Sequence, residues 1–305
     1  MKRLPNGHLL NVAFAAVFLS SLMFGASAYA APKAPAPEPD AVVTGVQMPA
    51  WLDRDGKSQP LTPGEQLRNG DSIRTGANSR VLVRTGDGSS VKLGENARLK
   101  LSNLGRREDN LFTAALDVAA GAFRFTTDVL AKIRHREVDV KIATITAGIR
   151  GTDIWGRAAS DKDLVCLLEG HIAVAHGNDP PVEMNDANTF FVVPKDAAPL
   201  PIAPVEAAKI AQWSLETEIT NGAGAARSGG KWKVILAVAD SQDAALDVYD
   251  AVRAGGYAAE IYPVGTTEKR RYQVRISQLP SKAEAQQLAN SLKGKFGVTA
   301  PSVAG

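Results

Sequence analysis

The residues best suited by type and spacing to bind a ligand lie near the end of the 305-residue chain. Arg271, Gln273 and Arg275 alternate with apolar and aromatic residues. Because successive side chains of a β-strand point to opposite faces, a strand here would place all three polar side chains on one face. Two guanidinium groups and one carboxamide in a row would hydrogen-bond a polar ligand. Alternation alone is also typical of a strand whose outer face is merely solvated.

The residues that catalysis or metal binding would require do not gather in the sequence. His171 and His176 stand five apart, which places them on opposite faces of a strand and is not metal-ligand spacing. Glu169 lies near His171 but has no nucleophile beside it. The sequence also lacks a Gly-rich phosphate loop and a nucleophile elbow. We therefore predict a protein that is not an enzyme and that uses no metal or cofactor.

The elements that would position the polar row form a small repeat. The predicted order is a strand Trp232–Val238, a helix Ser241–Ala254, a strand Tyr257–Tyr262, a strand Arg271–Ile276, a helix Ser281–Lys293 and a short closing strand near Val298. Ser281 and Glu284 have the spacing of a capping box that starts a helix. Such a split β-α-β repeat predicts a four-stranded antiparallel sheet with two helices on one face. The other face stays open, and we expect it to be a binding surface.

The framework of this repeat is specific. It combines the opening strand from Trp232, the turn Gly255-Gly256-Tyr257 and the strand Arg271–Ile276. On these residues the segment 231–300 resembles a SPOR domain, a small α+β module that binds peptidoglycan. The resemblance implies glycan strands without stem peptides as the partner and, for many members, a place at the division septum. Sugars offer hydroxyls and flat CH faces, so Arg271, Gln273 and Arg275 are the candidate glycan-binding residues.

The first strand departs from that family where the sugar would be held. Family members usually carry a Gln-x-Gly-Ser-Phe pattern, and Ile235 and Val238 stand at the places of its Gln and Ser. Ile235 is therefore a candidate site residue by position, although its side chain is apolar. An apolar surface at Ile235 and Ala237 would alternatively take a protein partner.

Residues 41–193 are predicted to form a mainly β domain. Short strands are separated by Gly, Asn and Asp turns, a spacing that suits either a sandwich or a solenoid. The stretches Gly70–Gly76 and Ala143–Ile154 resemble the FecR-like periplasmic domain. The second stretch contains the motif Arg150-Gly151-Thr152-Asp153, which we interpret as a structural corner. Arg150 and Asp153 could pair across that turn.

The FecR-like resemblance has a limited functional meaning. In regulatory members, the module relays a signal from an outer-membrane transducer to a cytoplasmic anti-sigma segment. Here about eight residues precede the first hydrophobic run, too few to fold or to bind a sigma factor. We therefore expect an extracytoplasmic recognition module, with an envelope protein as its partner, rather than anti-sigma activity.

The N-terminus is predicted to be an export signal. Lys2 and Arg3 precede an apolar run from Leu9 to Phe24, and Ala28-Tyr29-Ala30 offers a signal-peptidase site. Residues 1–30 would be removed and residues 31–40 would form a Pro/Ala spacer. The mature protein would lie in the periplasm of a Gram-negative bacterium, with no membrane span. A retained N-terminal anchor is the alternative.

Residues 194–230 are predicted to connect the two domains. A Pro-rich stretch is followed by a short helix between about Val205 and Ile219, whose apolar residues have helical spacing. Trp213 would dock this helix on the β domain, or the helix would bind a partner. The Gly- and Ala-rich residues 221–230 are expected to be a flexible linker.

Composition agrees with an exported binding protein. The formal net charge of +3 is too small to indicate nucleic-acid binding, and the single cysteine, Cys166, is predicted to be a buried thiol. The leading hypothesis is a non-catalytic, cell-wall-associated protein that binds glycan strands. The alternative is an envelope signalling or scaffold protein that acts through protein contacts. A wall-turnover enzyme using Glu169 or His171 is a more distant hypothesis.

Overall fold

The computed structural model describes residues 39–305 apart from 108–110, 129–134 and 150. The predicted signal peptide, residues 31–38 of the predicted spacer and Arg150 lie outside these described residues. None of the helices within them has the length and apolar character needed to cross a membrane.

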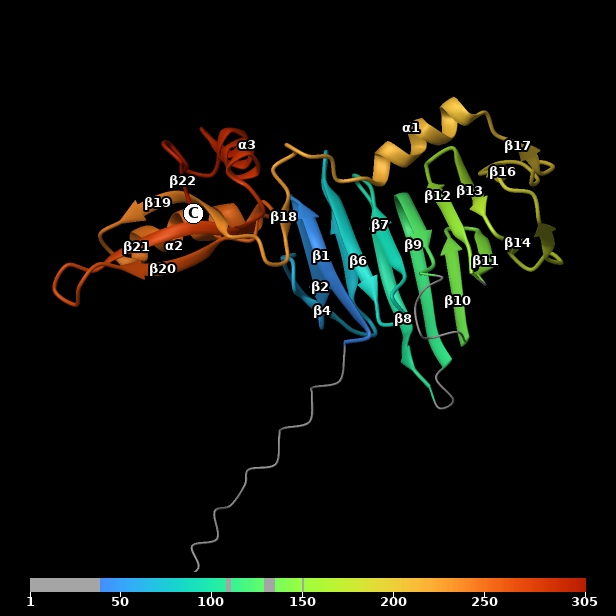
Figure 1. The fold of residues 1–305 in the computed structure, drawn as a ribbon, viewed down its shortest axis with the longest axis horizontal. Helices are drawn as coiled ribbons and strands as arrows, with labels where there is room; N and C mark the ends of the chain where they lie inside the picture. The colour runs from blue at the N-terminus through green and yellow to red at the C-terminus, as the bar shows by residue number, and fades with distance from the viewer. Residues whose placement is uncertain (1–38, 108–110, 129–134, 150) are drawn as a thin grey trace, which may run out of the picture. The chain divides into compact units, whose positions relative to one another are not determined.

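The strands between Ala41 and Pro194 form two facing sheets (Figure 1). They are β1 (Ala41–Gln47), β2 (Ala50–Arg54), β3 (Lys57–Pro60), β4 (Gln66–Leu67), β5 (Ser72–Thr75), β6 (Arg80–Thr85), β7 (Ser90–Leu93), β8 (Arg98–Arg106), β9 (Leu111–Thr126), β10 (His135–Ile142), β11 (Ile145–Ile149), β12 (Asp153–Ala158), β13 (Lys162–Glu169), β14 (Ile172–His176), β15 (Val182–Met184) and β16 (Thr189–Pro194). Sheet A contains β1, β4, β6, β7, β12, β13 and β16. Sheet B contains β2, β3, β5, β8, β10, β11, β14 and β15.

Strand β9 belongs to both sheets. Its first half pairs with β8 and β10 of sheet B, and its second half pairs with β7 and β12 of sheet A. Strand β9 passes from sheet B to sheet A at Gly121. The φ of this residue is +79°, which favours glycine. A Cβ atom at this position would lie 2.5 Å from Ala97 Cα, which also favours glycine. Phe123 and Phe125 are fully buried between the sheets. The prediction of a mainly β domain is confirmed, and the facing sheets correspond to the sandwich alternative.

A short helix covers part of the outer face of sheet A. The connector contributes β17 (Ala203–Pro204) and then α1 (Ala207–Thr217). Trp213 of α1 stacks on Trp155 of β12, with ring centroids 4.7 Å apart and planes 2° apart. These two rings join Leu164, Cys166 and Val192 in a second apolar cluster. The helix therefore docks on the β domain through Trp213, as the sequence predicted.

The C-terminal residues form the predicted α+β module. Its elements are β19 (Trp232–Ala239), α2 (Gln242–Ala254), β20 (Glu260–Val264), β21 (Arg271–Leu279), α3 (Lys282–Leu292) and β22 (Ser302–Ala304). The sheet order is β20-β21-β19-β22, and every pairing is antiparallel. The closing strand begins at Ser302 rather than near Val298, which is buried in the preceding turn.

Serine side chains start both helices of this module. Ser241 accepts a hydrogen bond from the Ala244 N–H, and Ser281 accepts one from the Glu284 N–H, each at 3.2 Å. Glu284 does not complete the predicted capping box. Its carboxylate instead accepts hydrogen bonds from the segment that precedes β19.

The Gly/Ala-rich segment before β19 makes backbone contacts with both modules: Glu284 of α3 accepts hydrogen bonds from it, and β1 pairs with it. The Glu284 carboxylate accepts the N–H groups of Gly222, Gly224 and Ala225 at 2.6, 2.5 and 3.0 Å. The next residues form β18 (Ala226–Arg227), which pairs with β1. Positive φ angles at Gly222 and Gly224 let these N–H groups converge on one carboxylate. The expected flexible linker is thus an ordered, hydrogen-bonded segment in the structure.

Candidate functional site

The C-terminal sheet has one covered and one open face. Both α2 and α3 pack on the face that carries Val274 and Ile276, which are buried. Since side chains alternate along β21, Gln273, Arg275 and Ser277 project from the opposite face. The alternation predicted from the sequence is therefore present, and it turns the polar row away from the helices.

Cross-strand register brings residues from all four strands onto this open face. One row reads Ser302, Ile235, Arg275 and Glu260, and the next reads Val238, Gln273 and Tyr262. Arg271 pairs with Val264 at the hairpin end of the sheet. The structure thus brings Ile235, Gln273 and Arg275 into adjoining rows and places Arg271 near them, at the start of β21.

Arg275 is the centre of the contacts on the open face. Its Nε lies 2.9 Å from Glu260 Oε1, and its guanidinium carbon lies 3.8 Å from the centroid of the Tyr262 ring. The Ser277 hydroxyl donates to the same carboxylate oxygen at 2.5 Å. These contacts hold the guanidinium over an aromatic ring, a contact that Arg commonly makes. A rigid planar donor of this kind can hydrogen-bond the hydroxyl or carboxylate oxygens of a ligand.

Sequence reasoning missed the contribution of β20. Tyr262 is 48% exposed and supplies the aromatic ring that a sugar-binding face needs. Glu260 supplies the carboxylate that positions Arg275. The alternation of Glu260, Ile261 and Tyr262 was visible in the sequence, but only the register between β20 and β21 places these side chains beside Arg275.

An apolar strip lies along the first strand of the same face. Ile235 is half-buried, whereas Val238 is 47% exposed. Both are paired with polar residues of β21, Ile235 with Arg275 and Val238 with Gln273. The face therefore combines hydrogen-bonding groups with exposed apolar area, which suits a ligand that presents both.

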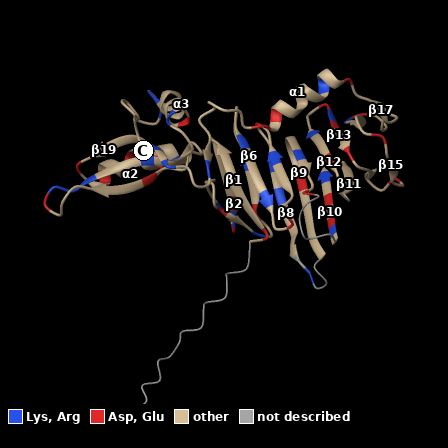
Figure 2. Ribbon diagram, viewed as in Figure 1, with Lys and Arg blue, Asp and Glu red and all other residues tan. Residues whose placement is uncertain are grey.

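Basic residues gather at the end of the open face, where β20 joins β21 (Figure 2). Lys269, Arg270 and Arg271 are all exposed there. Glu268, also exposed, is the acidic residue next to them. This end of the face favours an anionic ligand group over a cationic one.

The Arg-Gly-Thr-Asp motif lies at a corner between β11 and β12. Gly151 has a φ of +72°, and the Thr152 N–H donates to Thr127 Oγ1 at 3.1 Å. Asp153 accepts two hydrogen bonds from Arg124, at 2.9 and 2.6 Å. These contacts fit a structural corner, in which Arg124 of β9 forms an ion pair with Asp153. Arg150 lies outside the described residues.

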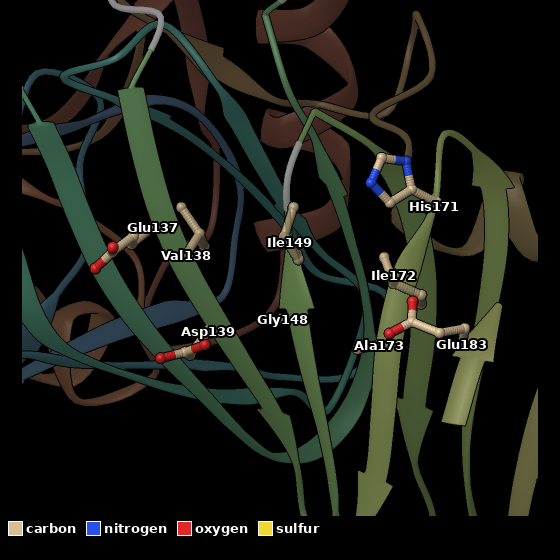
Figure 3. A pocket seen from close by; sticks show the side chains of 9 residues that line it. All are labelled: Glu137, Val138, Asp139, Gly148, Ile149, His171, Ile172, Ala173 and Glu183. Atoms are coloured by element: carbon tan, nitrogen blue, oxygen red, sulfur yellow. The ribbon is translucent and has the colours of Figure 1, made fainter. Parts of the chain in front are cut away.

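A shallow hollow of about 540 Å³ crosses sheet B (Figure 3). Gly148 and Ala173 form its floor, and Glu137, Asp139 and Glu183 stand around it (Figure 3). His171, the histidine considered above for catalysis, lies at its rim. The three carboxylates make the hollow suited to a cationic group, and its lining residues include no nucleophile.

The described chain therefore consists of two modules, a β-sandwich and a small α+β module whose sheet has one open face. Residues 71–173 match the family model described as FecR protein, and residues 228–300 match the SPOR domain. Both resemblances predicted from the sequence are thereby confirmed.

No curated protein sequence matches the chain. Two crystal structures, each provisionally described as that of an anti-sigma factor from Parabacteroides distasonis ATCC 8503, are similar, at 14% and 12% identity. The first alignment covers 47% of this chain and 64% of that one, and the second covers 72% and 89%. The TM-score is 0.39 for both, too low to carry an argument.

Proposed function

We propose that the protein binds peptidoglycan glycan strands through the open face of its C-terminal sheet. SPOR domains bind peptidoglycan, and residues 228–300 match that family. The observation that carries the proposal is the arrangement of Arg275, Gln273 and Tyr262 in adjoining rows on a face that neither α2 nor α3 covers. An exposed ring beside hydrogen-bonding side chains suits the flat faces and hydroxyls of a sugar polymer.

The test is co-sedimentation of the full-length protein with purified sacculi. Amidase-treated sacculi, whose glycan lacks stem peptides, should bind more protein than intact sacculi. Equal recovery with and without sacculi, from a protein whose circular dichroism is that of a folded chain, would exclude glycan binding.

The proposal extends to location and to the absence of catalysis. We infer an exported, periplasmic protein whose signal peptide, residues 1–30, is removed. Determining the N-terminal residue of the protein recovered from the periplasm tests this, with Ala31 as the expected residue. The two matched families are binding or regulatory modules, which supports a non-enzymatic role.

A second candidate function is a protein contact through the same face. The exposed Val238 beside Ile235 supports it, since neither side chain can hydrogen-bond a sugar. Under this alternative the FecR-like module would be part of an envelope signalling or scaffold assembly. Retention of the protein by sacculi stripped of proteins would argue against this alternative.

A further inference from the structure

The outer face of sheet A carries a row of basic and aromatic side chains. Lys92 of β7 pairs with Arg124 of β9, and Arg124 pairs with Trp155 of β12. Arg157 follows two residues later on β12, with its guanidinium carbon 5.3 Å from the Trp155 ring centroid. We call these four residues the basic-aromatic face. Such a face is complementary to carboxylates placed near an aromatic ring.

Helix α1 supplies that complement from within the chain. Trp213 stacks on Trp155, and Glu216 forms an ion pair with Arg157. Just after the helix, Glu218 pairs with Lys92 and lies 3.7 Å from Arg124 Nη1. Figure 2 shows the acidic end of α1 above the basic residues of these strands.

The sequence of α1 gives the helix little stability of its own. It has 11 residues, its N-cap Glu206 makes no side-chain capping bond, and its first turn contains no acidic residue. Glu216 and Glu218 instead lie at the C-terminal end, where the helix dipole disfavours negative charge. Helices this short are marginal when isolated. The contacts with the basic-aromatic face are therefore what keep α1 in place.

Helix α1 covers the outer face of sheet A only in part. An apolar hollow of about 620 Å³ lies between α1 and the edge of sheet A, lined by Trp213, Leu164, Phe190, Val192 and Leu200. Beneath the helix, the buried Trp155 Nε1 has no hydrogen-bond partner among the described residues. The hollow gives an incoming apolar side chain a place to bind before α1 has moved.

From these observations we infer that the basic-aromatic face is a docking site for an acidic, aromatic-containing segment of a partner protein. Helix α1 occupies the site in the absence of that partner. The contacts of α1 indicate which groups the partner segment must carry. It needs an aromatic ring to stack on Trp155 and carboxylates to pair with Arg157 and Lys92. The site is separate from the open face of the C-terminal sheet, so it does not depend on glycan binding.

The test uses a fluorescent peptide with the sequence of residues 205–220 as the probe. Full-length protein carrying Trp213→Ala, Glu216→Gln and Glu218→Gln should bind it at least about tenfold more tightly than wild type, because its own helix no longer competes. A peptide with glutamine in place of Glu216 and Glu218 should bind weakly. Leu215→Ala, at a side chain that is 63% exposed, is the matched control and should behave as wild type.

Three results would overturn the inference. One is a triple variant that keeps its circular dichroism yet does not bind the peptide. Another is hydrogen exchange in the wild-type protein that protects α1 amides as strongly as those of β12, since a displaceable helix must open more readily than the core. Displacement of the bound peptide by denuded glycan rather than by unlabelled peptide would also contradict a protein partner.

Discussion

At the scale of single residues, Arg275 dominates the proposed glycan site because it contacts both Glu260 and Tyr262. We expect Arg275→Ala to weaken sacculus binding about tenfold or more, since hydrogen bonds to charged groups contribute about 1.5–3 kcal/mol. Quantitative co-sedimentation measures the change. Lys293→Ala removes an equal charge at the end of α3 and should leave binding unchanged. Equal losses in both variants would point to general charge attraction rather than a defined site.

Ile235 and Val238, the apolar pair on β19, allow a test in which binding is expected to become tighter rather than weaker. Ile235→Gln with Val238→Ser places hydrogen-bonding side chains beside Arg275 and Gln273. If the face binds glycan, binding should become several-fold tighter, by about 1 kcal/mol for each added hydrogen bond. Weaker binding of the double variant in the same co-sedimentation assay would favour the apolar strip as the recognition element.

Cys166 illustrates a residue whose burial fixes its chemistry. It is fully buried under α1, and burial raises the pKa of its thiol to about 12. Because the thiolate is the reactive form, the native protein should react with iodoacetamide at pH 8 far more slowly than the urea-unfolded chain. Mass spectrometry distinguishes the two, and rapid labelling of the native protein would show that α1 exposes this face readily.

The polar row at Arg271, Gln273 and Arg275 could be predicted because it needs only the period of one strand. Tyr262 could not, because its place depends on the register between β20 and β21, which the hairpin residues between them set. Arg124 as the partner of Asp153 was missed for the same reason.

At the scale of elements, the Glu284 carboxylate at the start of α3 accepts three hydrogen bonds from the segment between α1 and β19. Glu284→Ala would leave the N–H groups of Gly222, Gly224 and Ala225 without their acceptor. We expect a loss of about 1–3 kcal/mol in the free energy of unfolding, measured by urea denaturation. Gln286→Ala, exposed on the same helix, is the control and should change it by less than about 0.5 kcal/mol.

The elements differed in how well they could be predicted. Helices α2 and α3 were predictable because serine caps and apolar spacing are local signals. The length of β9 was not, because one strand serves two sheets and its change of sheet at Gly121 depends on packing against Ala97. Helix α1 was predicted to dock through Trp213, but the basic residues that receive its glutamates come from β7, β9 and β12.

At the scale of the whole molecule, the segment between α1 and β19 determines how the two modules are joined. Its composition predicts a flexible linker, because Gly and Ala carry no side chains that could anchor it. The anchoring groups lie elsewhere: Glu284 receives its N–H groups, and β1 pairs with β18. The composition of the segment does not show that its backbone groups hydrogen-bond to residues far away in the sequence, so this order could not be predicted.

The hydrogen bonds of this segment predict a pattern of limited trypsin cleavage. Arg227 is held by pairing with Gly45, and the next N–H, that of Ser228, donates to the Thr44 carbonyl at 3.2 Å. Proteolysis needs a locally unfolded backbone, so the bond after Arg227 should be cleaved slowly. Arg270, exposed between β20 and β21, provides the internal comparison and should be cleaved first. If trypsin instead released an intact C-terminal module by early cleavage after Arg227, the segment would be a flexible linker, as its composition suggests.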